Sequence, residues 1–191
     1  MNTRDTIIYE SLKLFSTNGF DAVSTRMIAR AVGVSDTALY KHFKSKQEIF
    51  DTIILLCKER IEKQQEQMNI YAMTWEDVEQ VCMCMYQFQT EDEWIVMFRR
   101  LLLLEQFKNP EMAQLYQMFF VQGPINYAAV LFSKLMEGGY MKKKNPRVLA
   151  MELYAPFFMY HLVPSKDEKL LSELQEHVTY FCQINKRDKN Q

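Results

Sequence analysis

The side chains best suited to chemistry in this chain are the basic and hydroxyl residues gathered between positions 24 and 48. Lysine and arginine neutralise phosphates, hydroxyls hydrogen-bond phosphate oxygens, and short side chains let a helix approach the base edges of duplex DNA. Residues 24–46 hold five Lys and Arg against one Asp, a charge of +4, whereas the whole 191-residue chain carries −1. A cationic segment in a mildly acidic protein predicts a contact with nucleic acid.

The spacing within this segment predicts two short helices joined by a tight turn. Ser24 or Thr25 can cap the first helix, because a hydroxyl accepts the free N–H groups of a first turn. Gly33 stands where that helix must end, since glycine tolerates positive φ. Ser35 then caps a second helix over residues 36–43. This is the layout of a helix-turn-helix.

The apolar residues of both helices predict which sides face inward. Met27, Ile28 and Ala31 recur at helical spacing in the first helix, and Leu39 and Phe43 are four apart in the second. The residues left facing outward are Thr37, Ala38, Lys41 and His42, with Tyr40 at the margin.

A third helix is predicted to begin directly after this pair. Ser45 and Glu48 have the spacing of a capping box. Lys46 falls in the first turn, so its amine and the nearby free N–H groups could hold one phosphate together.

These residues and the segment before them resemble the N-terminal domain of TetR-family (tetracycline-repressor-like) transcriptional regulators. The resemblance covers roughly residues 5–50, about a quarter of the chain. Ser11, Val32, Thr37 and Ala38 depart from the family's usual residues. The matching positions are Leu12-Lys13-Leu14-Phe15, Gly19-Phe20, Val23-Ser24-Thr25, Ile28-Ala29, Gly33-Val34-Ser35, Leu39-Tyr40, His42-Phe43 and Ser45-Lys46-Gln47-Glu48.

The resemblance implies an all-α protein that binds a near-palindromic DNA operator as a homodimer. It implies a helix-turn-helix DNA-binding domain over residues 1–46 and a helical effector-binding and dimerisation domain over residues 47–191. The family's last two helices form a four-helix bundle with their copies in a second subunit. A repressor released by a small apolar or aromatic effector is the favoured function.

The resemblance also implies individual roles for the DNA-binding residues, alongside Ser35. Thr25, Tyr40, His42 and Lys46 would hold phosphates, and Arg26, Thr37, Ala38 and Lys41 would lie nearer the bases. Plainer interpretations remain open: Tyr40 as a packing residue, His42 as a cover for the edge of Phe43, and Arg26 and Lys44 as solvated surface charges.

Composition agrees with a helical cytoplasmic protein. Hydrophobic residues make up 48% of the chain, and only five glycines and five prolines occur beside thirteen methionines. The N-terminal MNTRDTIIYE is too polar for a secretory signal, and no apolar run approaches the roughly 18 residues that a membrane span needs. The four scattered cysteines suit a reducing compartment, and Cys82 and Cys84 lie on different helical faces, which argues against a metal pair.

The remaining sequence predicts further helices. Pro110 suits a first helical turn, a kink or break is expected at Gly123-Pro124, and Gly138-Gly139 should end that helix. The last two helices carry broad apolar faces that need a partner. The predicted helices span residues 47–70, 94–107, 146–162 and 166–185. A further helix is capped by Thr74 with Asp77 and ends at a break over 90–93, and a long one begins at residue 110.

No catalytic or cofactor-binding motif occurs in the sequence. The three histidines are far apart, and no phosphate-binding glycine loop, G-x-S-x-G or H-E-x-x-H is present. A ligand pocket is a stronger hypothesis, although each of its candidates could be ordinary core; Tyr127, Tyr160 and His161 are the polar ones. The candidates are Met85, Phe88, Trp94, Phe98, Tyr116, Phe119, Phe120, Tyr127, Phe157, Tyr160 and His161.

Two alternatives stay open. One is a helix-turn-helix regulator without a small-molecule effector, controlled by a protein partner or acting architecturally. The other is a helical enzyme, which converging carboxylates or a bound metal would support.

Overall fold

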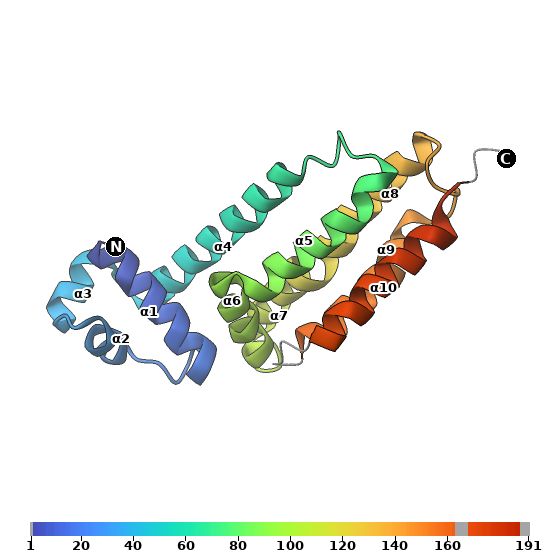
Figure 1. Ribbon diagram of the computed structural model, residues 1–191. Helices are drawn as coiled ribbons and strands as arrows, with labels where there is room; N and C mark the ends of the chain where they lie inside the picture. Colours follow the sequence, from blue (N-terminus) through green and yellow to red (C-terminus); the bar gives the residue numbers. More distant parts are fainter. Residues whose placement is uncertain (1, 163–167, 188–191) are drawn as a thin grey trace. The chain divides into compact units, whose positions relative to one another are not determined.

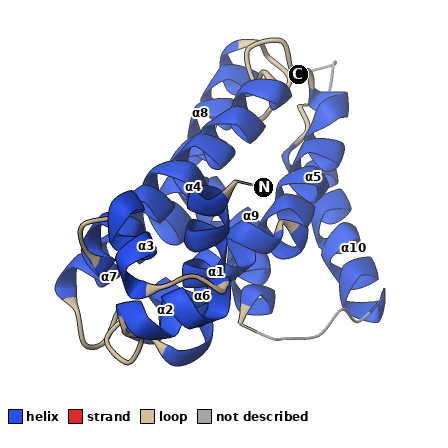
Figure 2. Cartoon of the chain, turned by 90° about the vertical axis from the view of Figure 1, so that its left-hand side faces the viewer, coloured by secondary structure: helices blue, strands red, loops and turns tan. Residues whose placement is uncertain are grey.

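The computed structural model describes residues 2–162 and 168–187, and each regular element in these ranges is a helix (Figure 2). The all-α class predicted from composition is therefore confirmed. The helices are α1 (Thr3–Asn18), α2 (Thr25–Val32), α3 (Asp36–His42), α4 (Lys46–Met68), the 3₁₀ turn η1 (Trp75–Asp77), α5 (Val78–Glu91), α6 (Glu93–Glu105), α7 (Pro110–Gln117), the π-helical turn η2 (Met118–Gln122), α8 (Gly123–Glu137), α9 (Pro146–His161) and α10 (Glu168–Asn185).

The chain divides into two compact units. The first comprises Met1–Gln64 with Glu91–Tyr116, and the second comprises Gln65–Thr90 with Gln117–Gln191. The domain boundary predicted between residues 46 and 47 falls after the first residue of α4, which continues as one helix to Met68. Which segments fold independently stays a prediction.

The first unit is built around α1. Asn2 begins this helix by accepting the Asp5 N–H through its side chain at 2.9 Å, and the N–H of Gly19 closes it on the Phe15 carbonyl. Helices α6 and α2 both pack against α1. The fully buried side chains of the first unit include Leu12, Phe15, Ile28, Leu39, Phe43, Ile49, Phe50, Phe98 and Leu101. This core fixes the short α2 and α3, which have too few residues to be stable alone.

The second unit packs α8 against α9 and α9 against α10, and these last two helices run side by side (Figure 1). Its core joins the inner faces of α5, α8, α9 and α10 and contains Val78, Phe132, Leu135, Leu149, Leu153, Phe157, Leu174, Val178 and Phe181. The C-terminus of α10 is tied to the loop after α8, where the amine of Lys144 donates to the Asn185 side chain at 3.0 Å. The basic loop at 142–144 thus contacts the last residue of α10.

Several predicted helix boundaries are confirmed and others shift. Asp77 accepts hydrogen bonds from the N–H and the hydroxyl of Thr74, so the predicted cap is present, although a 3₁₀ turn precedes α5. Where a break was expected at Gly123-Pro124, the π-helical turn η2 ends at Gln122 and α8 begins at Gly123, where an added Cβ would lie 2.6 Å from the Met118 carbonyl oxygen. The predicted start of the last helix at Lys166 lies outside the described residues.

Candidate nucleic-acid interface and cavity

Each of the two helices α2 and α3 begins at a serine cap. Ser24 Oγ accepts the Met27 N–H at 3.2 Å, and Ser35 Oγ accepts the Ala38 N–H at 3.2 Å. Gly33 adopts φ +77° and ψ 29°, the left-handed conformation that the sequence predicted for this position. The N–H of Val34 then donates to the Ala29 carbonyl at 2.9 Å, which closes the end of α2.

Helix α3 buries one side and exposes the other. Leu39 and Phe43 are buried, as their spacing predicted, and Thr37, Lys41 and His42 are exposed. Ala38 is half-buried beside them, and Tyr40 is 51% exposed. The predicted outward set therefore lies on the solvent side of α3.

The expectation for α2 was partly wrong. Ile28 is fully buried, but Met27 is 40% exposed and Ala31 is exposed. A helix of eight residues turns only a narrow side toward the core, and in α2 Ile28 and Ala29 form that side. Met27 consequently lies at the surface beside Arg26.

Two contacts link the beginning of α2 to α3. The hydroxyls of Thr25 and Tyr40 lie 3.3 Å apart, and Nε of Arg26 lies 3.5 Å from a carboxylate oxygen of Asp36. The Arg26 side chain is 87% exposed, so this ion pair orients the guanidinium without removing it from solvent.

Lys46 lies at the first residue of α4, as predicted, and its amine already has one acceptor. Nζ donates to the Phe20 carbonyl at 2.7 Å and lies 4.3 Å from the centroid of the Phe20 ring. An ammonium carries three hydrogens, so this bond leaves donors for a phosphate. Ser45 caps this helix, since its Oγ accepts the Glu48 N–H at 3.1 Å, but the Glu48 carboxylate accepts the Lys44 N–H at 2.6 Å, one residue before the partner that a capping box predicts.

The sequence reasoning missed one cation near this surface. The exposed Arg4, at the beginning of α1, places its guanidinium carbon 4.9 Å from the centroid of the Phe43 ring, directly after α3. Arg4 lies one residue before the segment that resembles the TetR family, so the sequence did not single it out. The packing of α1 brings it close to the end of α3.

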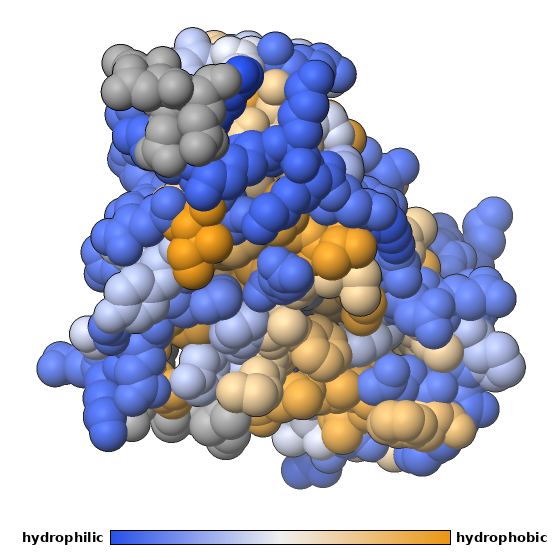
Figure 3. Space-filling model, turned by 90° about the vertical axis from the view of Figure 1, so that its right-hand side faces the viewer, coloured by the Kyte–Doolittle hydropathy of each residue, from blue (hydrophilic) through white to orange (hydrophobic). Residues whose placement is uncertain are grey.

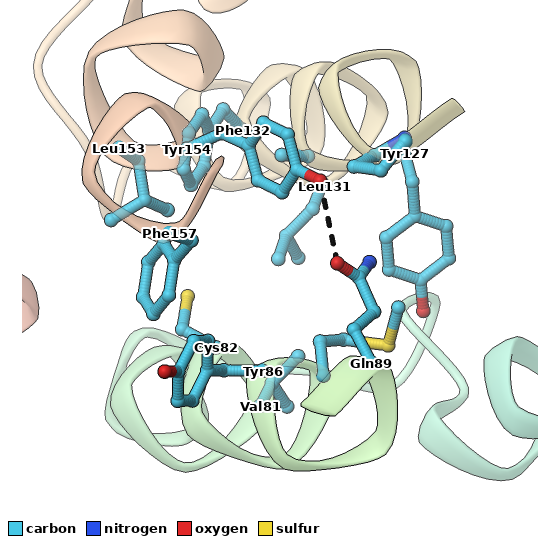
Figure 4. A pocket seen from close by; sticks show the side chains of 13 residues that line it. Val81, Cys82, Tyr86, Gln89, Tyr127, Leu131, Phe132, Leu153, Tyr154 and Phe157 are labelled. Atoms are coloured by element: carbon cyan, nitrogen blue, oxygen red, sulfur yellow. Dashed lines mark hydrogen bonds between the residues drawn. The ribbon is translucent and has the colours of Figure 1, made fainter. Parts of the chain in front are cut away.

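An apolar cavity of about 70 Å³ lies in the second unit, between α5, α8 and α9 (Figure 4). None of its thirteen lining residues is Lys, Arg, Asp or Glu. They are Val81, Cys82, Met85, Tyr86, Gln89, Pro124, Tyr127, Ala128, Leu131, Phe132, Leu153, Tyr154 and Phe157.

A small polar group interrupts the apolar lining. The hydroxyl of Tyr154 lies 2.9 Å from the Phe120 carbonyl in η2 and 3.3 Å from Oε1 of Gln89 (Figure 4). Burial raises the pKa of Tyr127 to about 12, so this phenol is neutral at physiological pH. The cavity therefore offers aromatic and aliphatic surface with neutral hydrogen-bonding groups.

The structure brings three of the predicted ligand-binding residues to this cavity: Met85, Tyr127 and Phe157. Trp94, Phe98 and Tyr116 belong to the first unit. Phe88, Phe119, Phe120, Tyr160 and His161 are in the second unit but not in the lining, although His161 stacks on the lining residue Tyr86 with ring centroids 5.8 Å apart.

The most informative lining residues that the prediction missed are Gln89, Tyr86 and Tyr154. Val81, Met85 and Gln89 are spaced by four along α5, so a glutamine at the end of an apolar stripe was a usable signal.

Other kinds of site find no support in the described residues. No group of three or more His, Cys, Asp or Glu side chains within them is placed to hold a metal ion. None of the helices in these ranges is long and apolar enough to cross a membrane.

Comparison with known proteins finds relatives of the segment that holds the helix-turn-helix. Residues 7–53 match the family described as bacterial regulatory proteins, tetR family. A 54-residue segment is 43% identical to the nucleoid occlusion factor SlmA of Escherichia coli O1:K1 / APEC; it covers 28% of this chain and 27% of that relative's length.

Solved structures match over nearly the whole chain. A putative TetR-family transcriptional regulator from Mesorhizobium loti MAFF303099 superposes with a TM-score of 0.72 at 18% identity, covering 96% of each chain. The ketosteroid transcriptional regulator KstR2 of Mycobacterium tuberculosis superposes with a TM-score of 0.72 at 13% identity, covering 98% of this chain and 96% of its own. At such identities the likeness concerns the fold.

These findings define a helix-turn-helix protein of the DNA-binding regulator class. Residues 7–53 match the tetR family of bacterial regulatory proteins, and the chain as a whole shares the helical fold of solved TetR-family regulators. The resemblance noted in the sequence is thereby confirmed.

Proposed function

We propose that the protein is a cytoplasmic, homodimeric repressor that binds a near-palindromic operator and is released by a neutral, apolar or aromatic effector. The observation that carries this proposal is the solvent-facing side of α3, with Thr37, Lys41 and His42 exposed on the second of two helices that each begin at a serine cap. A capped, exposed, cationic helix of this size suits the major groove.

The exposed residues divide by the contacts they are built to make. Lys41 and Thr37 lie on the free side of α3 and are assigned to base edges, together with Ala38 and Arg26. The hydroxyl, imidazole and ammonium donors nearer the helix ends are assigned to phosphates. These phosphate-contacting residues are Thr25, Ser35, Tyr40, His42 and Lys46.

Dimerisation is assigned to the outer faces of α9 and α10. Helix α9 buries Leu149, Leu153 and Phe157 inside the second unit. Its opposite side presents an exposed stripe of Val148, Met151, Ala155, Met159 and Leu162, and α10 adds exposed Tyr180 and Ile184. Apolar surface appears on the side of the chain where α10 lies (Figure 3). An apolar stripe backed by a packed inner face fits burial against a second copy.

Two copies of α3 would then enter successive major grooves, about 34–36 Å apart along the duplex. An effector releases the DNA if it binds better to the subunits when their α3 helices have another separation. Only this difference in effector affinity can shift the equilibrium between the DNA-binding form of the dimer and the form with another α3 separation.

The cavity is assigned to that effector. Its lining lacks ionised side chains, so it would bury a charged molecule at a high desolvation cost. Gln89, with Tyr127 at the rim of the same lining, supplies the hydrogen bonds that would orient one polar substituent. The ligand class is therefore a neutral molecule with a flat or greasy body and one polar group.

A second candidate function is favoured by one comparison. The relative with 43% identity in the DNA-binding segment carries the name of a nucleoid occlusion factor. A regulator that is governed by a protein partner, without a small-molecule effector, would fit such a relative. Thermal unfolding measured against a panel of neutral aromatic compounds separates the two functions, because stabilisation by a compound supports the effector and its absence across the panel supports the partner.

The primary test combines DNA selection with a dimer variant. Fragments bound from random duplex DNA should converge on a near-palindrome. Met159→Glu should leave the protein monomeric by light scattering and abolish operator binding, because it buries a carboxylate in an apolar interface. Met118→Glu, at an exposed methionine outside α9 and α10, is the matched control and should stay dimeric. A monomeric wild type, or a selection without any consensus, would overturn the proposal.

A further inference from the structure

The backbone of Phe20 is held by two opposite charges. Its N–H donates to Oε1 of Glu105 at 3.1 Å, and its carbonyl accepts from Nζ of Lys46 at 2.7 Å. The first partner is the last residue of α6 and the second is the first residue of α4. One residue of the connection between α1 and α2 thus links a carboxylate on one helix to an ammonium on another.

The Glu105 carboxylate is built into this position. Glu105 is only 3% exposed, and α6 packs along α1. At Gly19, with φ +84°, an added Cβ would clash with Oε1 of Glu105. A side chain at residue 19 would displace the carboxylate, so glycine here permits the close approach as well as the positive φ.

The Phe20 side chain adds rigidity to the same link. Its ring packs at 5.1 Å from the ring of Phe15 and 5.2 Å from that of Phe50, and the Lys46 ammonium lies over its face. Hydrogen bonds to charged groups are roughly twice as strong as neutral ones. Phe20 is therefore fixed on three sides, and through its carbonyl it fixes the direction of the Lys46 amine.

We propose that Glu105 is a positioning residue for DNA binding: through the Phe20 backbone it holds Lys46 where its remaining hydrogens meet a phosphate. This inference rests on the phosphate role of Lys46 within the proposed function. It makes the C-terminal end of α6 a control point, because a displacement of Glu105 would loosen Phe20 and with it the phosphate contact.

The proposal predicts a change in DNA affinity that is opposite to the change expected from net charge. Glu105→Gln removes a negative charge from a DNA-binding unit, and by net charge alone it should tighten binding to polyanionic DNA. If Glu105 positions Lys46, the same substitution weakens binding. A purely electrostatic role and a positioning role therefore predict opposite results.

The experiment measures operator affinity at several salt concentrations for Glu105→Gln, Lys46→Ala, the double variant and Glu111→Gln. Glu111 is an exposed carboxylate of the first unit, so its variant has the same charge change and serves as the matched control. Lys46→Ala should lower the salt slope by about 0.9. Glu105→Gln should weaken binding about three- to tenfold and lower the slope in the same direction, and in the Lys46→Ala background it should change affinity less than about twofold. Glu111→Gln should bind as well as the wild type or better.

Several outcomes would overturn the inference. Unchanged or tighter binding by Glu105→Gln would show that the carboxylate does not position Lys46. Independent, additive losses from the two substitutions would assign Glu105 to stability alone. If Lys46→Ala had no effect, the phosphate role would fail as well, while a wild type that binds no duplex would remove the proposed function itself.

A second variant guards against misfolding. Glu105→Asp keeps the charge but shortens the side chain by one methylene, so its carboxylate should withdraw from the Phe20 N–H. Circular dichroism and thermal unfolding establish that each variant is folded before binding is measured. Glu105→Asp should show the same loss of affinity and the same non-additivity with Lys46→Ala, and normal binding by it would contradict the proposal.

Discussion

The hydroxyls of Thr25 and Tyr40 lie 3.3 Å apart and join the first residue of α2 to the exposed side of α3. Because one hydroxyl donates to the other, the pair keeps one hydrogen that can be donated to a phosphate oxygen. The pair is local to the motif, so it can be tested without disturbing the core.

Tyr40→Phe should weaken binding to all duplex sequences alike, by about 1 kcal/mol or roughly fivefold, because one hydrogen bond from an uncharged, solvent-exposed hydroxyl to a DNA phosphate is lost. The salt slope should stay the same, since no cation is removed. Fluorescence anisotropy with operator and unrelated duplexes measures both quantities. Tyr71→Phe, at a tyrosine 74% exposed in the second unit, is the control. A changed sequence preference would instead move Tyr40 to the base-contacting group.

Ser11→Ala should stabilise the protein. Ser11 lies in α1 with no exposed surface, and its Oγ has no hydrogen-bond partner among the described residues. Removing a buried hydroxyl without a partner avoids a desolvation cost, so the free energy of unfolding should rise by about 1 kcal/mol. Thermal unfolding of the two proteins at equal concentration measures the difference. Ser16→Ala is the contrasting variant, because Ser16 Oγ donates to the Lys13 carbonyl at 2.9 Å; equal stabilisation by both would refute the argument.

Stability should fall at alkaline pH through Tyr127. Burial raises the pKa of this phenol from 10.0 to about 12 in the folded protein. The phenol is protonated in both states below pH 10, and between pH 10 and 12 only the unfolded chain ionises, so rising pH favours unfolding. Cys57, Cys82 and Cys182, with thiol pKa values raised by burial from 9.0 to about 12, contribute in the same direction from pH 9 upward.

Urea unfolding at pH 9, 10 and 11 measures this dependence. Tyr127→Phe should lose less stability than the wild type between pH 10 and 11, whereas Tyr71→Phe should follow the wild type. Parallel curves for the wild type and Tyr127→Phe would show that Tyr127 ionises normally in the folded state.

The helix-turn-helix could be predicted from sequence because its determinants are local. Ser24, Gly33 and Ser35 act on N–H and carbonyl groups within four residues of themselves. The inward spacing of Leu39 and Phe43 likewise depends only on the period of a helix. The prediction that Met27 and Ala31 face inward was wrong because α2 is short. Its contacts with α1, and not its apolar pattern, determine which side is buried.

The cavity could not be predicted in the same way, because it depends on three helices that are distant in the chain. Met85, Tyr127 and Phe157 come together only when α5, α8 and α9 pack. Trp94 and Phe98 are likewise aromatic residues at helical spacing. Their helix, however, belongs to the first unit, where Trp94 packs on Tyr9. Composition along a helix identifies an apolar face but not the neighbour that covers it.

The link between Glu105 and Lys46 also could not be predicted from the sequence. Lys46 was placed in the first turn of its helix by the Ser45 cap, and its phosphate role stays a prediction. That its amine donates to Phe20, and that Glu105 bonds the same residue from 85 positions away, follows from the packing of α6 on α1. Long-range hydrogen bonds to the backbone leave no periodic signal.

Lys41 tests the assignment of α3 to the major groove. Its side chain is exposed on the free side of α3, so we expect it to read base edges as well as supply charge. Lys41→Ala should relax preference at one or two positions of each half-site, with discrimination there reduced by about 1–3 kcal/mol. Lys44→Ala, at an exposed lysine just past the end of α3, removes the same charge and should weaken binding uniformly. Repeating the random-duplex selection with both variants measures the difference: an unchanged consensus for Lys41→Ala would move this lysine to the phosphate backbone and leave Thr37 and Arg26 as the base-reading residues.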